Sequence, residues 1–405
     1  MHVIFFRYHT VPDPEMVSPT ILVLGMITFG SLNTLVRQAQ METCSGSSFP
    51  SDPNLAKKCD DPTQEPFNKP WIGNLFMFIG EVMVFLGVWY EGRVSRRYVP
   101  VESEDASRPM LPAYYLAIPA SLDVLGSGLS GVSMLFISAS VWQMLRGSMI
   151  IYTAILSVIF LKRRLSQEQI LGLILAFLGL SLVGISAYLD SNGGMNYHQL
   201  FTGTYLLSHF ENSDNSSFVV FGIVLTVLSQ LCSAVQVVAE EALLKSGGRF
   251  TTPSPSRVVA YEGVWGLLMM TIVLVIMQLV PGEDHGSYEN SIDSVEKMGN
   301  NGFLFFLIIV YCISIALFNQ CGMAVSKYLS SLHRTLIDSL RALVVWAVQL
   351  GMFYGFDSTT YGVAWTANSL LQLLGFLLLV LGTLVYNEVI HIFKTSQASS
   401  PLVSE

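Results

Sequence analysis

Charged residues are scarce in this chain of 405 residues. Asp, Glu, Lys and Arg together make up 12% of the sequence, whereas hydrophobic residues make up 52%. A soluble domain carries roughly a quarter charged residues, so the composition argues against a soluble protein. The mean hydropathy of +0.53 and repeated apolar runs of about 20 residues indicate a single polytopic membrane bundle.

Features that mark several other protein classes are also missing. The chain has no basic cluster with interleaved aromatic residues, so nucleic acid binding has no support. It has no His and Cys cluster with metal-ligand spacing, and no cofactor is expected. Ser130 in "GLSG" (128–131) resembles a rhomboid protease serine, but His333 is expected near the opposite membrane surface, beyond hydrogen-bond reach. Asp123 and Asp338 lack the settings of intramembrane aspartyl proteases, so no enzyme is predicted.

Ten apolar segments are long enough to cross a bilayer. Helices are expected, because lipid offers no partner for exposed backbone amides and a barrel would show short alternating segments. The predicted fold class is therefore an all-α polytopic membrane protein with ten transmembrane helices. The segments cover residues 17–36, 71–90, 113–134, 138–161, 167–189, 218–240, 258–280, 303–326, 331–354 and 363–390.

Lysine and arginine are unevenly distributed over the loops. A cytosolic N-terminus places most of the 21 Lys and Arg residues on the cytosolic side, in agreement with the positive-inside rule. Both termini are then cytosolic, and Glu240 and Glu241 are expected in water at the cytosolic edge of their helix. The opposite side carries an acidic loop at 281–297 and holds Arg37, Lys57, Lys58, Lys69 and Lys297.

The chain is expected to divide into two five-helix halves. The first covers residues 17–190 and the second covers residues 218–390, with a lumenal linker at 191–217. Residues 1–16 form an N-terminal extension that is too short for a span and lacks the order of a signal peptide. Residues 391–405 form a cytosolic tail.

The two halves share a sequence pattern. "QMLR" (143–146) matches "DSLR" (338–341), so Arg146 aligns with Arg341. Because five helices separate the copies, the second copy enters the membrane from the opposite side. This predicts an inverted-topology repeat, which is typical of secondary transporters. A duplication with a purely structural role is the alternative.

Glycines repeat in the next helix of each half. "LGLILAFLG" (171–179) matches "LGFLLLVLG" (374–382), which aligns Gly172 with Gly375 and Gly179 with Gly382. These glycines are expected to permit close packing between helices.

Ionisable residues lie deep in several spans, and each would cost about 2.5–3.5 kcal/mol if it faced lipid. At 1.5 Å per residue, Arg146 and Arg341 lie roughly 12 Å and 15 Å from the starts of their helices, near the midplane. We therefore predict a water-filled cavity with a substrate site, and the alternative is a set of ion pairs that locks the helices together. The predicted cavity residues are Asn33, Glu81, Asp123, Gln143, Arg146, Gln236, Glu262, Asn319, Asp338 and Arg341.

These charges also predict pairings. Asp338 and Arg341 are one turn apart and can neutralise each other. Arg146 has no acid one turn away on its own helix, so its expected partner is Glu81, Asp123 or a substrate anion. Glu81 or Asp123 is the expected proton-responsive group.

Two covalent features are predicted on the non-cytosolic side. Cys44 and Cys59 lie in the first loop there, and a disulfide between them would contribute roughly 3 kcal/mol. Two free thiols are the alternative. Asn215 begins an N-x-S glycosylation sequon on the same side.

Five stretches resemble a known family. "SASVWQMLRGSMIIYTAILSVIFLKRRL" (138–165) resembles the fourth-helix motif of the drug/metabolite transporter superfamily. The nearest branch holds the solute carrier family 35 subfamily F, member six type, and chloroquine-resistance-transporter-like proteins. Four further stretches resemble the same branch and occur in the same order: "GE" (80–81), "QVVAEEALL" (236–244), "YEGVWG" (261–266) and "LIDSLRALVVWAVQL" (336–350). The resemblance covers about residues 17–390.

The resemblance implies a five-plus-five inverted repeat and a central cavity that works by alternating access. It implies a carrier of nucleotide sugars, drugs, peptides or amino acids in an endomembrane, with lysosome or vacuole favoured over Golgi. Residues 281–302 lack the cysteines of chloroquine-resistance-type transporters, so their substrate class is not carried over. An anionic solute, a cationic or peptide solute exported from an acidic organelle with protons, and a non-transporting scaffold all remain open. The expected partners are a small-molecule solute and the lipid bilayer.

Overall fold

The protein is a bundle of long helices. The computed structural model describes residues 18–49, 59, 61–67, 69–98, 109–133, 145–191, 216–245, 250–282, 284–356, 362 and 364–390. Within these residues, nine helical segments are long and apolar enough to cross a membrane, and one further apolar helix is shorter. The tenth predicted span, 138–161, is represented by this shorter helix, because residues 138–144 lie outside the described part.

The helices follow the predicted segments in order. Up to residue 191 they are α1 (Pro19–Glu42), α3 (Pro70–Met83), α4 (Phe85–Tyr98), the 3₁₀ turn η2 (Ala113–Leu116), α5 (Ala117–Ser133), α7 (Ser148–Phe160) and α8 (Gln167–Ser191). Beyond it they are α11 (Ser216–Lys245), α12 (Pro255–Leu279), α13 (Ser291–Asn300), α14 (Gly302–Tyr328), α15 (Ser331–Phe356) and α16 (Ser369–Tyr386).

Local sequence sets several helix starts. Pro19, Pro70 and Pro255 occupy the first turns of α1, α3 and α12. Proline is tolerated there because the N–H groups of the first turn have no acceptor within the helix. Asn290 and Asn301 cap α13 and α14, because each side chain accepts two backbone N–H groups of the first turn.

Helix α1 is longer than its apolar run. It was expected to end at residue 36 but continues to Glu42, so Arg37 is part of the helix rather than of a loop. Three hydrogen bonds hold this polar extension. Arg37 Nη2 donates to the carbonyl oxygens of Lys69 and Pro70 at 3.3 and 3.1 Å, and the fully buried Gln40 donates to Leu307 O at 3.0 Å.

Two predicted spans are interrupted beside their charged residues. The span at 71–90 divides at Val84, whose N–H bonds to Glu81 O only three residues back, as in a tightened turn. Arg146 was expected in the middle of a continuous helix, but α7 begins only at Ser148 and Gly147 forms a turn between them. Backbone irregularity at such depth is tolerated where protein or a cavity surrounds it.

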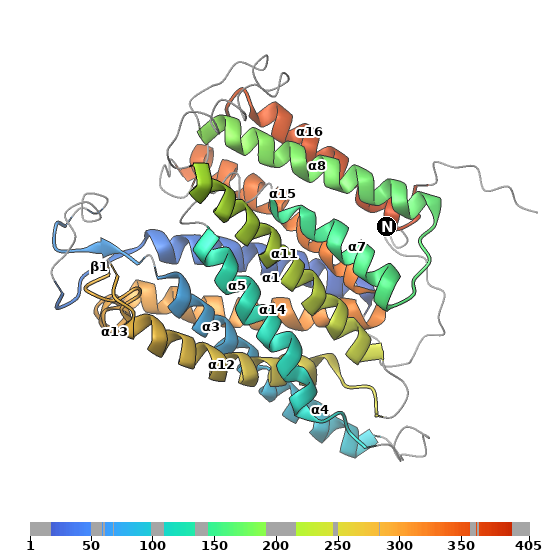
Figure 1. Ribbon diagram of the computed structural model, residues 1–405, viewed down its shortest axis with the longest axis horizontal. Coiled ribbons are helices and arrows are strands. Elements are labelled where there is room, and N and C mark those ends of the chain that lie inside the picture. Colours follow the sequence, from blue (N-terminus) through green and yellow to red (C-terminus); the bar gives the residue numbers. More distant parts are fainter. Residues whose placement is uncertain are drawn as a thin grey trace, which may run out of the picture.

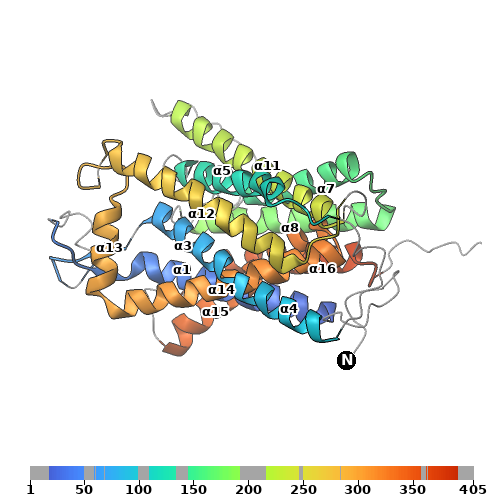
Figure 2. The same ribbon diagram turned by 90° about the horizontal axis from the view of Figure 1, so that it is seen from below.

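The helices pack mainly in pairs from distant parts of the chain. Helix α8 packs against α16, α1 against α14, α11 against α5, and α12 against α3. Further contacts join α7 with α11 and α1 with α15. Figures 1 and 2 show the resulting elongated bundle, in which α8 and α16 form one layer and α3, α12 and α14 lie on the other side of α11.

Glycines form the contact between α8 and α16. A Cβ on Gly172 would lie 2.7 Å from Gly382 O, and a Cβ on Gly179 would lie 2.5 Å from Gly375 O. The backbones therefore touch directly, which confirms the close packing predicted for these four residues. Because the earlier glycine of one helix faces the later glycine of the other, the two helices are antiparallel.

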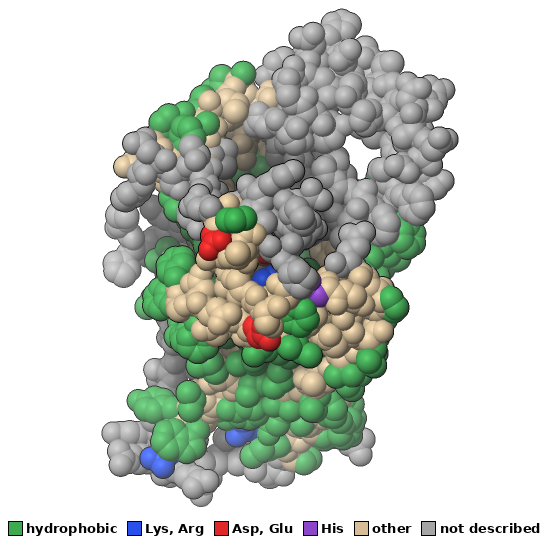
Figure 3. All heavy atoms as spheres, turned by 90° about the vertical axis from the view of Figure 1, so that its left-hand side faces the viewer, with side chains coloured by type: hydrophobic (Ala, Val, Ile, Leu, Met, Phe, Trp, Pro, Cys, Tyr) green, Lys and Arg blue, Asp and Glu red, His purple; other side chains and the backbone are tan. Residues whose placement is uncertain are grey.

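A small ordered cap closes one end of the bundle, here called the α13 end. Strands β1 (Cys44–Ser45) and β2 (Glu65–Pro66) pair antiparallel beside α13, and the predicted Cys44–Cys59 disulfide is present. Glu289 accepts the first backbone N–H groups of α3, from Trp71 and Ile72, at 3.0 and 2.7 Å. Figure 3 faces this end and shows charged side chains at its centre, with hydrophobic side chains along the flanks.

Candidate functional site

A polar cavity of about 200 Å³ lies between α1, α7, α8, α11, α15 and α16. Arg146, Asp338 and Arg341 line it. The rest of the lining is partly aromatic and partly polar, because it includes Trp346 and Phe376 as well as the amide side chains of Gln230, Gln349 and Gln372. We call this cavity the arginine pocket.

Arg341 is fixed on the pocket wall by three contacts. Its Nη2 lies 3.3 Å from Oδ1 of Asp338, which confirms the predicted pairing one turn apart on α15. The guanidinium stacks over the ring of Phe318 at 5.1 Å. Gly30 of α1 lies against the Arg341 side chain, and a Cβ there would come within 2.9 Å of it.

Arg146 enters the pocket from the helical residues just before the Gly147 turn that precedes α7. The charges that act on it most strongly are those of Arg341 and Asp338. Among the described residues that line the pocket, two guanidinium groups and one carboxylate give a net charge of about +1, which favours an anionic group. Glu81 and Asp123, which were expected as partners of Arg146, belong to a different cluster.

That second cluster, here called the acid cluster, brings four carboxylates around one guanidinium. Glu81 of α3, Asp123 of α5, Glu240 of α11 and Glu262 of α12 interact electrostatically with one another and with Arg334 of α15. Arg334 forms an ion pair with Glu240. Three of the carboxylates predicted to line the cavity therefore meet here and not in the arginine pocket.

Amide side chains complete the acid cluster. Asn319 Nδ2 donates to Oε1 of Glu81 at 2.6 Å. Gln236 donates to Glu240 at 2.9 Å and also bonds to Asp123. Asn33, in contrast, joins neither cluster, because its Nδ2 donates to Ser314 Oγ at 3.4 Å and links α1 to α14. Gln143 and Asn215 lie outside the described residues.

The prediction that Glu240 and Glu241 are solvated is wrong. Their exposed fractions are 0% and 1%. Glu241 accepts from the backbone N–H and the hydroxyl of Ser331 at 2.7 and 2.6 Å, and its Oε1 lies 2.6 Å from Lys245 Nζ. The mistake arose because the helix was ended at residue 240, whereas α11 continues to Lys245 and packs against α15.

Sequence reasoning also missed functional neighbours. Arg334, which lies on α15, was not singled out from the sequence, and neither were Gln349 and Gln372 of the arginine pocket. Helical spacing could have indicated Arg334 and also the role of Glu240. Glu240 stands four residues after Gln236, on the same face of α11, and Arg334 stands two turns before Arg341.

A third ionic group lies in the cap at the α13 end. Lys69 bonds to Asp284 and lies 2.8 Å from Asp293, while Lys297 lies 2.9 Å from Asp293 and 3.0 Å from Glu65. Burial opposes ionisation of Asp293, but hydrogen bonds from Lys69, Ser47 and Lys297 outweigh it and lower its pKa to about 2.

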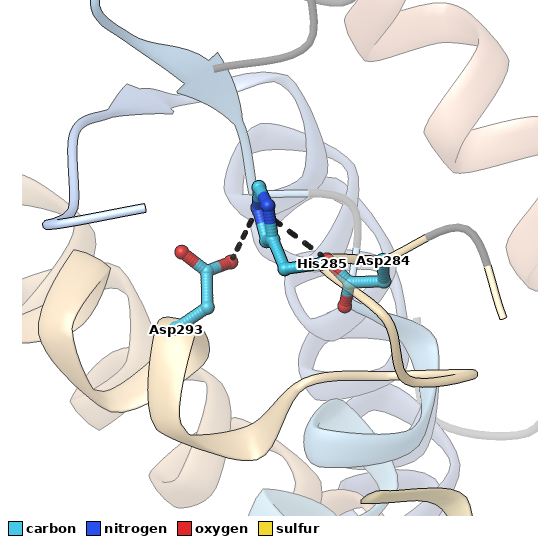
Figure 4. Close-up of side chains that lie close together, drawn as sticks. All are labelled: Asp284, His285 and Asp293. Atoms are coloured by element: carbon cyan, nitrogen blue, oxygen red, sulfur yellow. Dashed lines mark ion pairs between the residues drawn. The ribbon is translucent and has the colours of Figure 1, made fainter. Parts of the chain in front are cut away.

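The same group includes the side chains that come closest to a metal-ligand set. The ligand atoms of Asp284, His285 and Asp293 lie within 4.8 Å of one another, and His285 Nε2 is 3.8 Å from Asp284 and 4.0 Å from Asp293 (Figure 4). The ammonium groups of Lys69 and Lys297 already neutralise these carboxylates. The residues therefore fit an ion-pair network that ties α13 to the strands better than a metal site.

Long apolar helices with buried charges and a polar cavity between them define a multi-pass integral membrane protein. The profile of the UAA transporter family matches residues 63–344, and the chain belongs to this family of the drug/metabolite transporter superfamily. Solute carrier family 35 member F6 of Homo sapiens is 31% identical over 367 residues, which cover 89% of this chain and 86% of the relative. The protein of the same name from Mus musculus is 30% identical over the same coverage.

The fold itself has a precedent. One crystal structure superimposes on this protein with a TM-score of 0.54 at 11% sequence identity. The match covers 90% of this chain and 97% of the other chain. At that identity the likeness concerns the arrangement of the helices alone.

Proposed function

We propose that the protein is a secondary carrier that moves an organic solute across an endomembrane by alternating access, with the solute bound in the arginine pocket. The observation that carries this proposal is that Arg146 and Arg341, from different halves of the chain, line one cavity together with Asp338. Membership of a transporter family supports it.

The contacts between helices support an inverted repeat with two halves at 17–190 and 218–390. If the halves are exchanged, the contact of Gly172 with Gly382 becomes that of Gly375 with Gly179, and both contacts exist. The pair α1 and α14 likewise becomes α11 and α5, which also pack together. An exchange axis between antiparallel helices runs perpendicular to them, and therefore in the membrane plane.

The size of the pocket fits a closed or partly closed state. A volume of about 200 Å³ is smaller than the roughly 300–1,000 Å³ of typical ligand sites. The two guanidinium groups can hold a carboxylate or phosphate group in this space, and the remainder of a larger solute requires the halves to separate. The cationic alternative is weaker here, because the surplus charge of the pocket is positive.

The proposed orientation has cytosolic termini and a lumenal α13 end. The Lys and Arg bias supports it, and so does the Cys44–Cys59 disulfide, because the lumen is oxidising during synthesis. We favour a lysosomal or vacuolar membrane over the Golgi on the basis of the family resemblance.

The test is solute flux in proteoliposomes. Vesicles with the purified protein would be incubated with an organelle metabolite extract, and the solutes taken up would be identified by mass spectrometry. We expect uptake of an organic anion that falls at least tenfold in Arg146→Ala and Arg341→Ala. Arg93→Ala is the matched control, because Arg93 is exposed on α4 and stacks over Trp89. Equal uptake in all variants would contradict the assigned pocket.

A membrane scaffold is the second candidate, and one observation favours it. The buried Glu240–Arg334 pair and the Asn33–Ser314 bond join helices without lining the arginine pocket. If the buried charges serve only to hold the helices together, vesicles with and without the protein take up solutes from the extract equally. Arg146→Ala then lowers the unfolding temperature and has no transport to reduce.

A further inference from the structure

The acid cluster contains more negative charge than its protein contacts can balance. Burial is nearly complete, since the exposed fractions are 4% for Glu81, 0% for Glu240 and 6% for Glu262. Within the described part of the chain, Arg334 is the cation that acts on this cluster, and its ion pair is with Glu240. Glu81, Asp123 and Glu262 therefore remain without an ion-pair partner of their own among the described residues.

Two carboxylate oxygens in this cluster also lack hydrogen-bond donors. Oε2 of Glu81 and Oε1 of Glu262 are buried and have no hydrogen-bond partner among the described residues. Elsewhere in the cluster, Asn319 donates to Oε1 of Glu81 and Gln236 bonds to Asp123. A buried polar atom without a partner is expensive, so its retention points to a ligand that joins it.

Helices α12 and α14 pack closely against α3 at Glu81. Gly263 of α12 lies against the Glu81 side chain, where an added Cβ would come within 2.6 Å, and Gly80 lies against the backbone of Cys312 in α14. A proton needs no additional space in this packing, because it only converts an existing carboxylate oxygen into a hydrogen-bond donor. The titratable or charged groups that face this position are Asp123, Glu240, Glu262, Tyr311 and Arg334.

One helix connects the acid cluster to the arginine pocket. Helix α15 carries Arg334 in the acid cluster and, further along, Asp338 and Arg341 in the pocket. The charge of Asp338 also acts on Arg334 across one turn. A change in charge at Glu81 or Glu262 therefore reaches the pocket through Arg334 and α15.

We propose that the acid cluster is a proton site, separate from the solute pocket, at which Glu81 and Glu262 take up and release the protons that drive transport. This proposal rests on the proposed carrier function. Protonation of the two carboxyl groups removes their mutual repulsion and allows each free oxygen to act as a donor. Deprotonation returns two negative charges beside Arg334 and weakens its hold on Glu240, which moves α15 relative to α11.

Proton binding can be measured without a solute. Infrared difference spectra of the purified protein in lipid would be recorded while pH is lowered from 8 to 5, and the carbonyl band of buried carboxylic acids would be followed. We expect this band to respond to pH in the wild type and to lose most of its intensity in Glu81→Gln/Glu262→Gln. Glu296→Gln is the matched control, because Glu296 lies in the cap and bonds to Ser48. A band that the double variant leaves unchanged would overturn the proposal.

Coupling is tested separately from binding. In proteoliposomes loaded with the same metabolite extract, an imposed pH gradient should drive net uptake by the wild type but not by the double variant. Exchange of solute between the two sides should persist in that variant, because it needs the arginine pocket and no net proton movement. Gradient-driven uptake that survives the double substitution contradicts the proton site. Wild-type vesicles that show neither uptake nor exchange contradict the carrier function, while the infrared result still decides the proton site.

Discussion

Arg341 Nη2 lies 3.3 Å from Oδ1 of Asp338, one turn earlier on α15, and both side chains face the arginine pocket. The pair reduces the positive charge of the pocket without removing it, because Arg146 contributes a second guanidinium. Asp338 is therefore expected to control how strongly the pocket attracts an anion.

The first prediction concerns this balance. Asp338→Asn keeps the shape of the side chain but raises the net charge of the pocket by one unit. We expect the KM for an anionic solute to fall several-fold and its release to slow, since charge complementarity acts on both. Concentration-dependent exchange in proteoliposomes measures this. A rise in KM with unchanged protein stability would show that the transported solute is cationic.

The glycine contact between α8 and α16 gives a second prediction. Gly172→Ala places a methyl group against the backbone of Gly382 and Tyr386, and overpacking of this kind destabilises by about 1–3 kcal/mol. We expect a lower unfolding temperature in detergent. Gly351→Ala is the matched control, because its added Cβ meets no atom within 4 Å and helix propensity alone then favours alanine. Equal unfolding temperatures for the two variants would contradict the direct backbone contact.

The third prediction concerns the pH dependence of the cap. Asp293 has a pKa of about 2 in the folded protein, below its ordinary value of 3.8. Its contribution to stability is therefore complete above about pH 4 and is lost as the pH falls toward 2. Thermal unfolding should show no effect of this group between pH 7 and 5, and a decline below pH 4 that Asp293→Asn removes. A decline already at pH 6 that depends on Asp293 would show that the ion pairs are not formed.

A fourth prediction concerns Lys297, which joins Asp293 and Glu65 and has an exposed fraction of 2%. Lys297→Met leaves two buried carboxylates with one ammonium fewer, and removal of one partner of a buried ion pair costs about 3–5 kcal/mol. We expect the cap to open, and the Cys44–Cys59 disulfide to become reducible under conditions in which the wild type resists. Gel mobility after graded reduction measures this, and identical reduction curves would count against a structural role for the network.

Sequence patterns predicted the features that depend on nearby positions. The spans follow from runs of apolar residues, the Asp338–Arg341 pair from one-turn spacing, and the Cys44–Cys59 disulfide from two cysteines in one short loop. The glycine contact followed from small residues repeated on one helix face. Each of these signals is contained within one segment or one matched pair of segments.

Features that depend on which helices face each other could not be predicted in this way. Glu240 and Arg334 lie on α11 and α15 and meet only because these helices pack together. For the same reason the acids were assigned to Arg146, although α3, α5 and α12 bring them to Arg334. The cap was treated as an acidic loop, because the pairing of its carboxylates with Lys69 and Lys297 requires the folded α13.

The most direct test of alternating access is the accessibility of Ser339, which lines the arginine pocket. A variant with Cys232, Cys312 and Cys321 replaced by alanine and Ser339→Cys would be treated with a membrane-impermeant maleimide from either side of sealed vesicles. The account predicts labelling from both sides, with the proportion shifted by the transported solute. Labelling that is confined to one side under every condition would contradict it.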